Sequence, residues 1–302
     1  MRRRTLALSL VALALAGCAH SGAAAQPSAA PTGVTFPATA GGVTLTQRPI
    51  HIISLSPTAT EMLFAIGAGG QVTAVDDRST YPSVAPRSTL SGFKPNAEAI
   101  AQKNPDLVVL SDDIDTVKEQ LGQLKIPVYQ GPAAKTLDDT YAQLRDLGTL
   151  TGHRPEADAL VQKLTERLDK LTKAVPRRST PLTYYYELDP TLYTATSKTF
   201  IGSLFTRLGL RNVADQADQA GSGYPQLSAE TLVKADPDLI FLADTVCCKQ
   251  SAATVRARAG WAGMRAVRSG QVVALNDDIA SRWGPRVVDL VQAVTDAVAK
   301  AR

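Results

Sequence analysis

Short apolar runs alternate with amphipathic stretches along most of the chain. The apolar runs predict buried strands, and the amphipathic stretches, bounded by capping residues, Pro or Gly, predict helices. Strands are expected at 50–55, 72–75, 108–110, around 128, and at 183–188, 240–242 and 272–275; helices are expected at 57–66, 116–124, around 137–147, and at 155–175, 198–208, 252–258 and from 285 onward. Because strand and helix alternate, the sequence predicts an α/β fold with mostly parallel sheets.

Two stretches of the chain, 96–107 and 228–239, are near copies of one another. Each predicts a capped amphipathic helix, a Pro-Asp stop and a buried strand. Both copies place a glutamate in the first helical turn, Glu98 and Glu230, where a negative charge favours the helix dipole. The repetition predicts two similar lobes, and the matched surface acids suggest paired docking points rather than two isolated helix-stabilising charges.

The most regular helical pattern, at 155–175, lies between the two copies. Its apolar stripe is unbroken, Pro155 suits its first turn and Pro176 ends it, so the helix is about 30 Å long. We expect it to join an N-terminal lobe at 48–153 to a C-terminal lobe at 177–302, the connecting segment itself spanning 154–176. In the first turn of the helix at 57–66, Thr58 and Glu61 have capping-box spacing, and Gly67 suits its left-handed end.

The amino-terminal segment has the pattern of an export signal. Three arginines precede an apolar run too short to cross a bilayer, and small residues follow. We therefore expect a signal peptide at 1–17, and the four residues ending at Cys18 look like a lipobox, in which the cysteine is lipidated. Residues 18–47 then form a lipidated cysteine and tether rich in Ala, Ser, Gly, Pro and Thr. The mature protein is expected outside the cytoplasmic membrane, on its outer face or in a periplasm, held by lipid alone.

Composition excludes several classes of protein. Without its first 17 residues the chain has 29 basic and 28 acidic residues, which gives no reason to expect a nucleic-acid partner. Motifs of zinc hydrolases, serine hydrolases and P-loop enzymes are missing, and the three histidines are not spaced to bind a metal together, so no metal site or cofactor is expected. Cys247 and Cys248 are adjacent, and either form a strained vicinal disulfide or remain thiols.

Polar and aromatic residues gather after the predicted strands, where ligand crevices of parallel sheets lie. Aromatic faces with convergent charges suit a large planar or polydentate ligand. The candidate ligand-binding residues are Arg78, Tyr81, Phe93, Tyr193, Tyr224, Asp278, Arg282, Trp283 and Arg286. Acids after strands are also common turn formers and helix caps, and Trp283 could equally pack between the lobes.

Four segments together resemble a known family. They are 53–61 (ISLSPTATE), 104–109 (NPDLVV), the connecting helix and 235–240 (ADPDLI). The chain resembles, from about residue 48 to its end, the substrate-binding proteins of ABC importers for ferric siderophores, haem and cobalamin. The resemblance implies one chelate bound between the lobes and little hinge motion. It also implies that Glu98 and Glu230 meet arginines on the two permease subunits, which work with an ATPase.

The cobalamin branch of the family is similar to this chain in several places. The similarities are the Ser-Pro-x-x-Thr-Glu opening, the pairs Tyr81-Pro82 and Tyr224-Pro225, and an acid and an arginine near Asp278 and Arg286. The chain departs from that branch at Phe93, where a tryptophan is more usual, and at its adjacent cysteines.

We therefore expect a monomeric capture protein without covalent chemistry, with a corrinoid such as cobalamin as the favoured ligand and a ferric siderophore or haem as the alternative. An extracytoplasmic hydrolase using the acid pairs at 76–77 or 277–278 is the alternative of another class. Adjacent acids on an extended strand point apart, however, whereas acid–base pairs face each other across a substrate. A metal-free sensor lobe is a third possibility.

Overall fold

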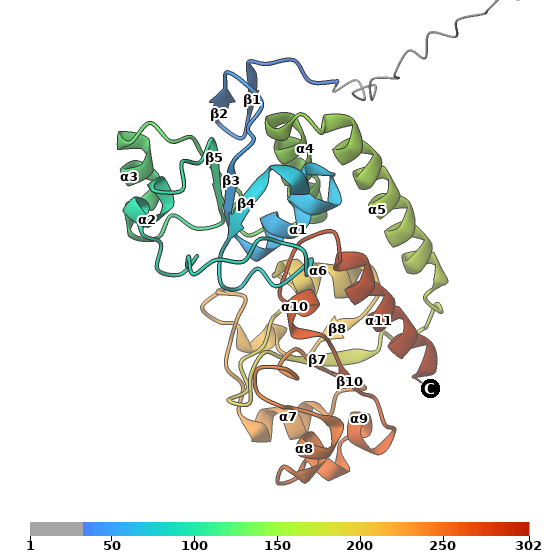
Figure 1. Cartoon of the computed structure of the whole chain (residues 1–302). Coiled ribbons are helices and arrows are strands. Elements are labelled where there is room, and N and C mark those ends of the chain that lie inside the picture. The colour runs from blue at the N-terminus through green and yellow to red at the C-terminus, as the bar shows by residue number, and fades with distance from the viewer. Residues whose placement is uncertain (1–32, 302) are drawn as a thin grey trace, which may run out of the picture. The chain divides into compact units, whose positions relative to one another are not determined.

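Two four-stranded parallel sheets organise the protein (Figure 1). The structure, a computed structural model, describes residues 33–301, so the expected signal peptide, Cys18 and the first part of the tether lie outside the described residues. The first sheet has the order β4-β3-β5-β6 and the second the order β10-β9-β7-β8. Their strands are β3 Ile52–Leu55, β4 Val72–Val75, β5 Leu107–Leu110, β6 Val128–Gln130, β7 Thr183–Glu187, β8 Arg211–Asn212, β9 Leu239–Leu242 and β10 Val272–Ala274. The predicted α/β fold with two parallel sheets is confirmed.

Helices follow the strands in each lobe, as the alternation of patterns predicts. The first lobe contains α1 Pro57–Ala65, α2 Ala97–Ala101, α3 Val117–Gln123 and α4 Leu137–Thr151, with 3-10 turns at Ala68–Gln71 and Ile114–Thr116. The second contains α6 Phe200–Arg207, α7 Ala229–Ala235, α8 Ala252–Ala257, α9 Arg265–Arg268, α10 Asp277–Ala280 and α11 Val287–Lys300, with 3-10 turns at Asp215–Ala217 and Trp261–Gly263. The repeated segments form α2–β5 and α7–β9, which confirms that the internal repeat marks equivalent positions of the two lobes.

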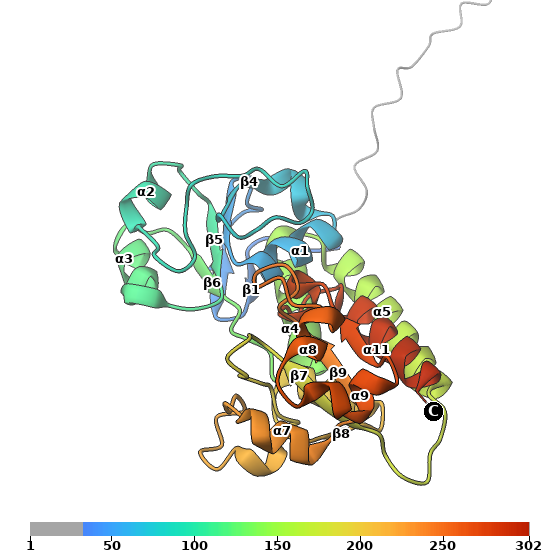
Figure 2. The same cartoon turned by 90° about the horizontal axis from the view of Figure 1, so that it is seen from below.

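The connecting helix is α5, Arg154–Ala174, one residue displaced from its predicted bounds. Its buried stripe includes Val161, Leu164 and Leu168. The stripe packs against α4 and α11, and α5 and α11 run side by side in both views (Figures 1 and 2). The largest apolar cluster is continuous from β3 and α1 through α4 and α5 to α6 and α11, so the two lobes share one core.

Three consecutive tyrosines in β7 show how the second sheet is buried on both faces. Tyr184 and Tyr186 share a face and pack on Phe205 of α6, with ring centroids 4.6 and 5.7 Å away. Tyr185 points to the other face, where its ring meets Trp261 edge-on at 6.3 Å. The three side chains therefore alternate between the two faces of the sheet, as successive residues of a strand do.

The expected tether is wrong over part of its range. Within it, β1 Ala38–Ala40 and β2 Val43–Leu45 pair as an antiparallel hairpin, and β1 contacts α4. Ala38 and Leu45 are buried, and a Cβ at Gly41 would lie 2.3 Å from the Tyr129 ring. Strands of three residues are too short for an alternating pattern to stand out in a segment rich in small residues.

The start of α1 also differs from its prediction. Its N-cap is Ser56, whose hydroxyl accepts a hydrogen bond from the Ala59 N–H, and Pro57 occupies the first turn. Glu61 is therefore not the acid of a capping box, and its side chain is free for another role. Gly67 follows the helix with φ of 88°, as predicted for a left-handed helix end. No helix among residues 33–301 has the length and apolar character needed to cross a membrane.

Candidate ligand-binding cleft

A cleft of about 760 Å³ lies between the lobes. Its walls come from segments that follow five strands: Ser56, Asp76 and Ser111 come directly after β3, β4 and β5, and Val246 and Asp278 follow β9 and β10 within four residues. The carboxyl ends of parallel strands are where ligands bind in open α/β sheets. The volume is also within the range of about 300–1,000 Å³ that is typical of small-molecule sites.

A second hollow of about 760 Å³ lies at the opposite end of the second sheet. It is lined by Asp238, Arg265, Arg268, Ser269, Gln271, Lys300 and Ala301. Asp238 and Gln271 immediately precede β9 and β10, so this hollow faces the amino ends of the strands. Its lining comes from the second lobe alone and contains no aromatic side chain, whereas residues of both lobes line the cleft. We therefore take the cleft as the candidate site.

Hydroxyl groups hydrogen-bond to one another beside the cleft in the first lobe. The Thr60 hydroxyl donates to Ser54 Oγ at 2.9 Å, and the Ser111 hydroxyl donates to Ser56 Oγ at 2.6 Å. Gly92 passes so close to the strand end that a Cβ there would lie 2.6 Å from the Leu55 carbonyl oxygen. These contacts fix the backbone around the cleft before any ligand arrives.

Asp76 is a buried acid in the cleft wall, 2% exposed. Burial raises the pKa of its carboxyl above the usual value, and the charge of neighbouring Asp77 adds to that, although hydrogen bonds from Ser79 act in the opposite direction. Its Oδ1 atom has no hydrogen-bond partner among residues 33–301. The protonated form is therefore favoured more than at an exposed aspartate.

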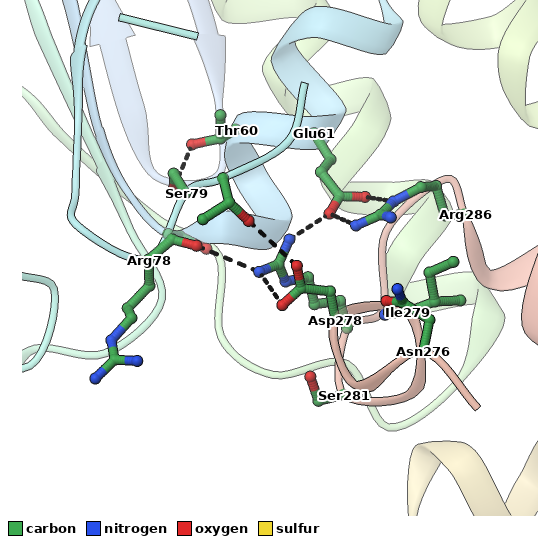
Figure 3. A network of polar contacts seen from close by, with 12 residues as sticks. Thr60, Glu61, Arg78, Ser79, Asn276, Asp278, Ile279, Ser281 and Arg286 are labelled. Atoms are coloured by element: carbon green, nitrogen blue, oxygen red, sulfur yellow. Dashed lines mark hydrogen bonds and ion pairs between the residues drawn. The ribbon is translucent and has the colours of Figure 1, made fainter. Parts of the chain in front are cut away.

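An ion network crosses from α1 to the second lobe beside the cleft (Figure 3). Glu61, 3% exposed, accepts from Arg282 Nη1 at 2.7 Å through Oε1 and from Arg286 Nε at 2.8 Å through Oε2. Arg286 Nη2 also donates to Oε1 at 2.5 Å. Hydrogen bonding to Glu61 raises the pKa of Arg286, although burial opposes this. One buried carboxylate therefore holds two guanidinium groups of the other lobe.

The network extends to the loop after β4. Arg282 Nη2 donates to Asp278 Oδ1 at 2.8 Å, and the Thr80 hydroxyl donates to Asp278 Oδ2 at 3.1 Å. Arg282 Nη2 also lies 3.3 Å from the Arg78 carbonyl oxygen, which accepts a hydrogen bond from it. The Arg78 side chain extends away from the network (Figure 3). Backbone and side chains of the two lobes are thus tied at several points.

The structure brings five of the predicted ligand-binding residues together. They line the cleft: Arg78, Phe93, Asp278, Arg282 and Trp283. Phe93 is 70% exposed, and the Trp283 indole N–H donates to Gln143 Oε1 at 2.9 Å. Trp283 also packs against the shared core, so lining the cleft and packing between the lobes are both true of it.

The other four predicted residues lie outside the cleft lining. Tyr81 and Arg286 line a neighbouring groove of about 470 Å³, and the Arg286 guanidinium lies 4.1 Å from the centre of the Tyr81 ring. Tyr193 and Tyr224 are 43% and 50% exposed, and neither belongs to the cleft wall. Arg286 is directed to Glu61 rather than to the cleft, a pairing that sequence reasoning missed because its partner is distant in the chain.

Sequence reasoning also missed several smaller residues of the cleft. They are Ser56, Thr58, Thr80, Ser111, Val246 and Ser281. Most follow a predicted strand within a few positions, which is the signal that could have found them. Serine and threonine are common in turns, so their position after a strand is a weaker signal of a binding site than that of a charged or aromatic residue.

Comparison with known proteins decides the class of the chain. Residues 52–279 match the periplasmic binding protein family. The chain belongs to that family. This confirms the expectation of a binding protein rather than an enzyme.

Individual relatives of this periplasmic binding protein are similar over nearly their whole lengths. The chain is 31% identical to the cobalamin-binding protein of Halobacterium salinarum over 98% of this chain and 85% of the relative. It is 29% identical to the uncharacterized ABC transporter substrate-binding lipoprotein YvrC of Bacillus subtilis, over 97% and 95% of the two chains. The crystal structure of the periplasmic vitamin B12 binding protein BtuF of Vibrio cholerae matches with a TM-score of 0.70 and 26% identity, covering 83% and 97%.

The two acids of the predicted pair at 277–278 are directed to different partners in this binding protein. Asp277 accepts N–H bonds from the loop after β9, including 2.8 Å from Cys247, whereas Asp278 is directed to Arg282. Burial alone would raise the pKa of Asp277, but the N–H groups of Cys247 and Val246 hold it below its usual value. Asp277 is therefore a structural acceptor for that loop, in line with the reading of such acids as turn residues.

Cys247 and Cys248 lie in the same loop, next to the cleft residue Val246. Both are free thiols in the structure, and Cys247 is exposed. A buried carboxyl, Asp244, lies near the start of the loop, and burial, together with the charge of Glu187, raises its pKa to about 7. Glu187 itself is fully buried and binds Arg258 through two contacts of 2.6 Å.

The two predicted docking glutamates are surface residues. Glu98 and Glu230 each lie in the first turn of their helix, behind the N-caps Asn96 and Ser228. Both side chains are exposed. Among residues 33–301, neither makes an ion pair with another side chain, so both carboxylates are available to a partner. No cluster of three or more metal-ligating side chains occurs in that part of the chain.

Proposed function

We propose that this periplasmic binding protein captures a corrinoid such as cobalamin in the cleft between its lobes and delivers it to an ABC permease. The observation that carries the proposal is the similarity, along nearly the whole chain, to a relative named as a cobalamin-binding protein. A solved structure named as a vitamin B12 binding protein supports it with the same fold.

The geometry of the cleft supports a large chelate. Phe93 of the first lobe and Trp283 of the second both line it, and aromatic faces suit contact with a macrocycle. Hydroxyls of Ser56, Ser111 and Ser281 add donors and acceptors for polar substituents. The metal belongs to the ligand in this proposal, and the protein contributes no cofactor of its own. Tyr193 and Tyr224, which are exposed and lie outside the cleft lining, remain proposed ligand contacts.

Titration of the mature protein with cobalamin, haem and a ferric siderophore tests the proposal. Cobalamin is expected to bind saturably at one site, measured by calorimetry and by quenching of tryptophan fluorescence. Tighter binding of haem or the siderophore would replace the corrinoid with that ligand. Saturable binding of none of the three would refute a chelate-binding function.

The two tryptophans provide an internal control for the fluorescence signal. Trp283 lines the cleft, whereas Trp261 is 1% exposed and packs against Tyr185. Trp283→Phe should therefore remove most of the ligand-induced quenching, and Trp261→Phe should retain it. Equal loss in both variants would indicate absorption by the ligand rather than contact.

Delivery requires contact with a permease dimer that works with an ATPase. We place this contact at Glu98 and Glu230, which are exposed on equivalent helices of the two lobes. Reversing both charges with Glu98→Arg and Glu230→Arg should abolish uptake while leaving the dissociation constant of the ligand nearly unchanged. The matched control reverses two other exposed glutamates, Glu119 and Glu166, and should retain uptake.

We also propose export by the signal peptide at 1–17 and lipid anchoring through Cys18, with the folded part acting as a monomer. A relative named as a lipoprotein supports anchoring. Cys18→Ser should release the protein from the membrane fraction. If the variant remains membrane-bound after a salt wash, the lipid anchor is refuted.

A further inference from the structure

The charges around the cleft are unevenly distributed between acids and bases. Its lining contains four aspartates and two arginines, namely Asp76, Asp77, Asp112, Asp278, Arg78 and Arg282. A site for an anionic chelate would need more cationic groups than this, because desolvated carboxylates are recognised by guanidinium or ammonium donors. The lining therefore points away from anionic ligands.

The ion network makes the imbalance larger than the residue count suggests. Arg282 is held by two carboxylates, Glu61 at 2.7 Å and Asp278 at 2.8 Å. Arg286 is held by Glu61 and covered by the Tyr81 ring. The two arginines and two acids compensate one another, so neither guanidinium is available to neutralise an incoming anion.

The remaining charges of the cleft are then those outside the network. They are the exposed acids Asp77 and Asp112 and a single cation, Arg78, while the third acid, Asp76, is buried, which raises the pKa of its carboxyl. Asp77 and Asp112 are exposed, so their carboxylates can accept hydrogen bonds from N–H donors of a ligand. Such a surface repels carboxylates and suits amide groups.

We infer that the cleft selects neutral or cationic chelates over anionic ones, and that Glu61 is a positioning residue that permits this selection by withdrawing the charges of Arg282 and Arg286 from the ligand. This inference rests on the proposed function and adds the charge class of its ligand. The repulsive element is as important as the attractive one, since specificity is a difference between two affinities.

Two pairs of ligands test the inference, because the members of each pair differ in charge and little in shape. The first is a corrinoid whose side chains end in amides and the same corrinoid with those amides hydrolysed to carboxylates. The second is haem dimethyl ester and haem. In each pair the neutral member should bind at least about tenfold more tightly at low salt, which corresponds to a difference of about 1.4 kcal/mol. Raising the ionic strength should narrow the ratio of the two dissociation constants in each pair, because salt screens the repulsion between like charges.

Variants of the free cleft acids change the charge without touching the ion network. Asp77→Asn with Asp112→Asn should narrow the ratio by about tenfold, as expected for removing two charges several ångströms from the ligand. The control, Asp115→Asn with Asp296→Asn, removes two exposed acids that do not line the cleft and should leave the ratio unchanged.

Glu61→Gln tests the positioning role directly. It leaves two guanidinium groups without their shared carboxylate, so binding of the carboxylate ligands should strengthen relative to the neutral ones. A purely structural role would weaken both members of a pair equally and leave the ratio unchanged. If Glu61→Gln does not fold, the double aspartate variant still tests the charge selection of the cleft.

The outcomes for the two proposals are separate. Failure of the amide corrinoid to bind refutes the proposed corrinoid function, while the haem pair still measures charge selection. Equal binding within both pairs, or a ratio that the cleft aspartates do not alter, overturns the inference. If neither neutral macrocycle binds, both proposals are overturned.

Discussion

Replacing Glu61 with glutamine should strongly destabilise the folded protein. The carboxylate is buried and accepts three charge-assisted hydrogen bonds from Arg282 and Arg286, whose side chains are 10% and 18% exposed. Removing one partner of a buried ion pair costs about 3–5 kcal/mol, because the other charge stays buried without compensation. Since one kcal/mol shifts the melting temperature of a domain of this size by about 2–4 °C, we expect a decrease of roughly 6–20 °C.

Thermal unfolding followed by circular dichroism measures this effect in the ligand-free protein. The control is Glu166→Gln, an exposed glutamate of α5 that accepts a hydrogen bond only from Gln162 in the next turn. That change should alter the free energy of unfolding by no more than about 0.5 kcal/mol. A melting temperature for Glu61→Gln within about 2 °C of the unmodified protein would refute the argument that the network stabilises the pair of lobes.

A further comparison separates loss of the network from loss of one partner. Replacing Glu61, Arg282 and Arg286 together with methionine removes all the buried charges at once. Such a triple change should be less destabilising than Glu61→Gln alone, because no uncompensated charge remains. If the triple variant is less stable than Glu61→Gln, the ion pairs contribute more to the free energy of unfolding than the desolvation of their charges costs.

Three other predictions follow from buried groups. Burial raises the pKa of Asp244 to about 7, above the value of about 3.9 in an unfolded chain. Between these two pH values the folded state binds more protons than the unfolded state, so the stability of the protein falls as pH rises from about 4 to 7. The melting temperature of Asp244→Asn minus that of the unmodified protein should therefore become more positive between pH 5 and pH 8, and a constant difference would contradict the assignment. Gly92→Ala places a Cβ 2.6 Å from the Leu55 carbonyl oxygen, so it should lower the free energy of unfolding by about 1–3 kcal/mol in a urea titration and weaken ligand binding. The control Gly122→Ala, in a helix with open space around the new Cβ, should not destabilise the protein in the same titration. Leu164→Ala, in the core that both lobes share, should cost about 2–5 kcal/mol in a single cooperative transition, and two separate transitions would show that the lobes unfold independently.

Local patterns were sufficient to predict most of the fold. The stripe of α5, the caps Asn96 and Ser228 and the left-handed Gly67 each depend on neighbours within a few residues, and all are present in the structure. The hairpin at 38–45 was missed because its stabilising contacts, such as those of Gly41 with Tyr129, come from residues far along the chain. The predicted helix at 198–208 was slightly too long, because α6 spans Phe200–Arg207 and begins only after its N-cap Thr199.

The candidate site shows the same division between local and distant information. The position of Asp278 after a strand was sufficient to predict that it lies in the cleft wall. The partner of Arg286 was not predictable, because Glu61 lies 225 residues earlier and carries no local sign that it is buried. Glu61 also has capping-box spacing, which explains a glutamate at that position from local sequence alone and gives no reason to expect a distant partner.

The shared core and the ion network together limit how this protein can respond to a ligand. Closely packed interiors move between discrete arrangements rather than deforming continuously, and here one apolar cluster runs through α1, α5 and α11. Rotation of the lobes would disrupt both this cluster and the contacts of Glu61. The loops after β4 and β9 carry cleft residues outside the core, so we expect them to accommodate the ligand. The separation of Glu98 and Glu230 is then expected to be nearly the same with and without ligand. If the proposed docking at these residues is right, a permease would have to distinguish the two states through those loops.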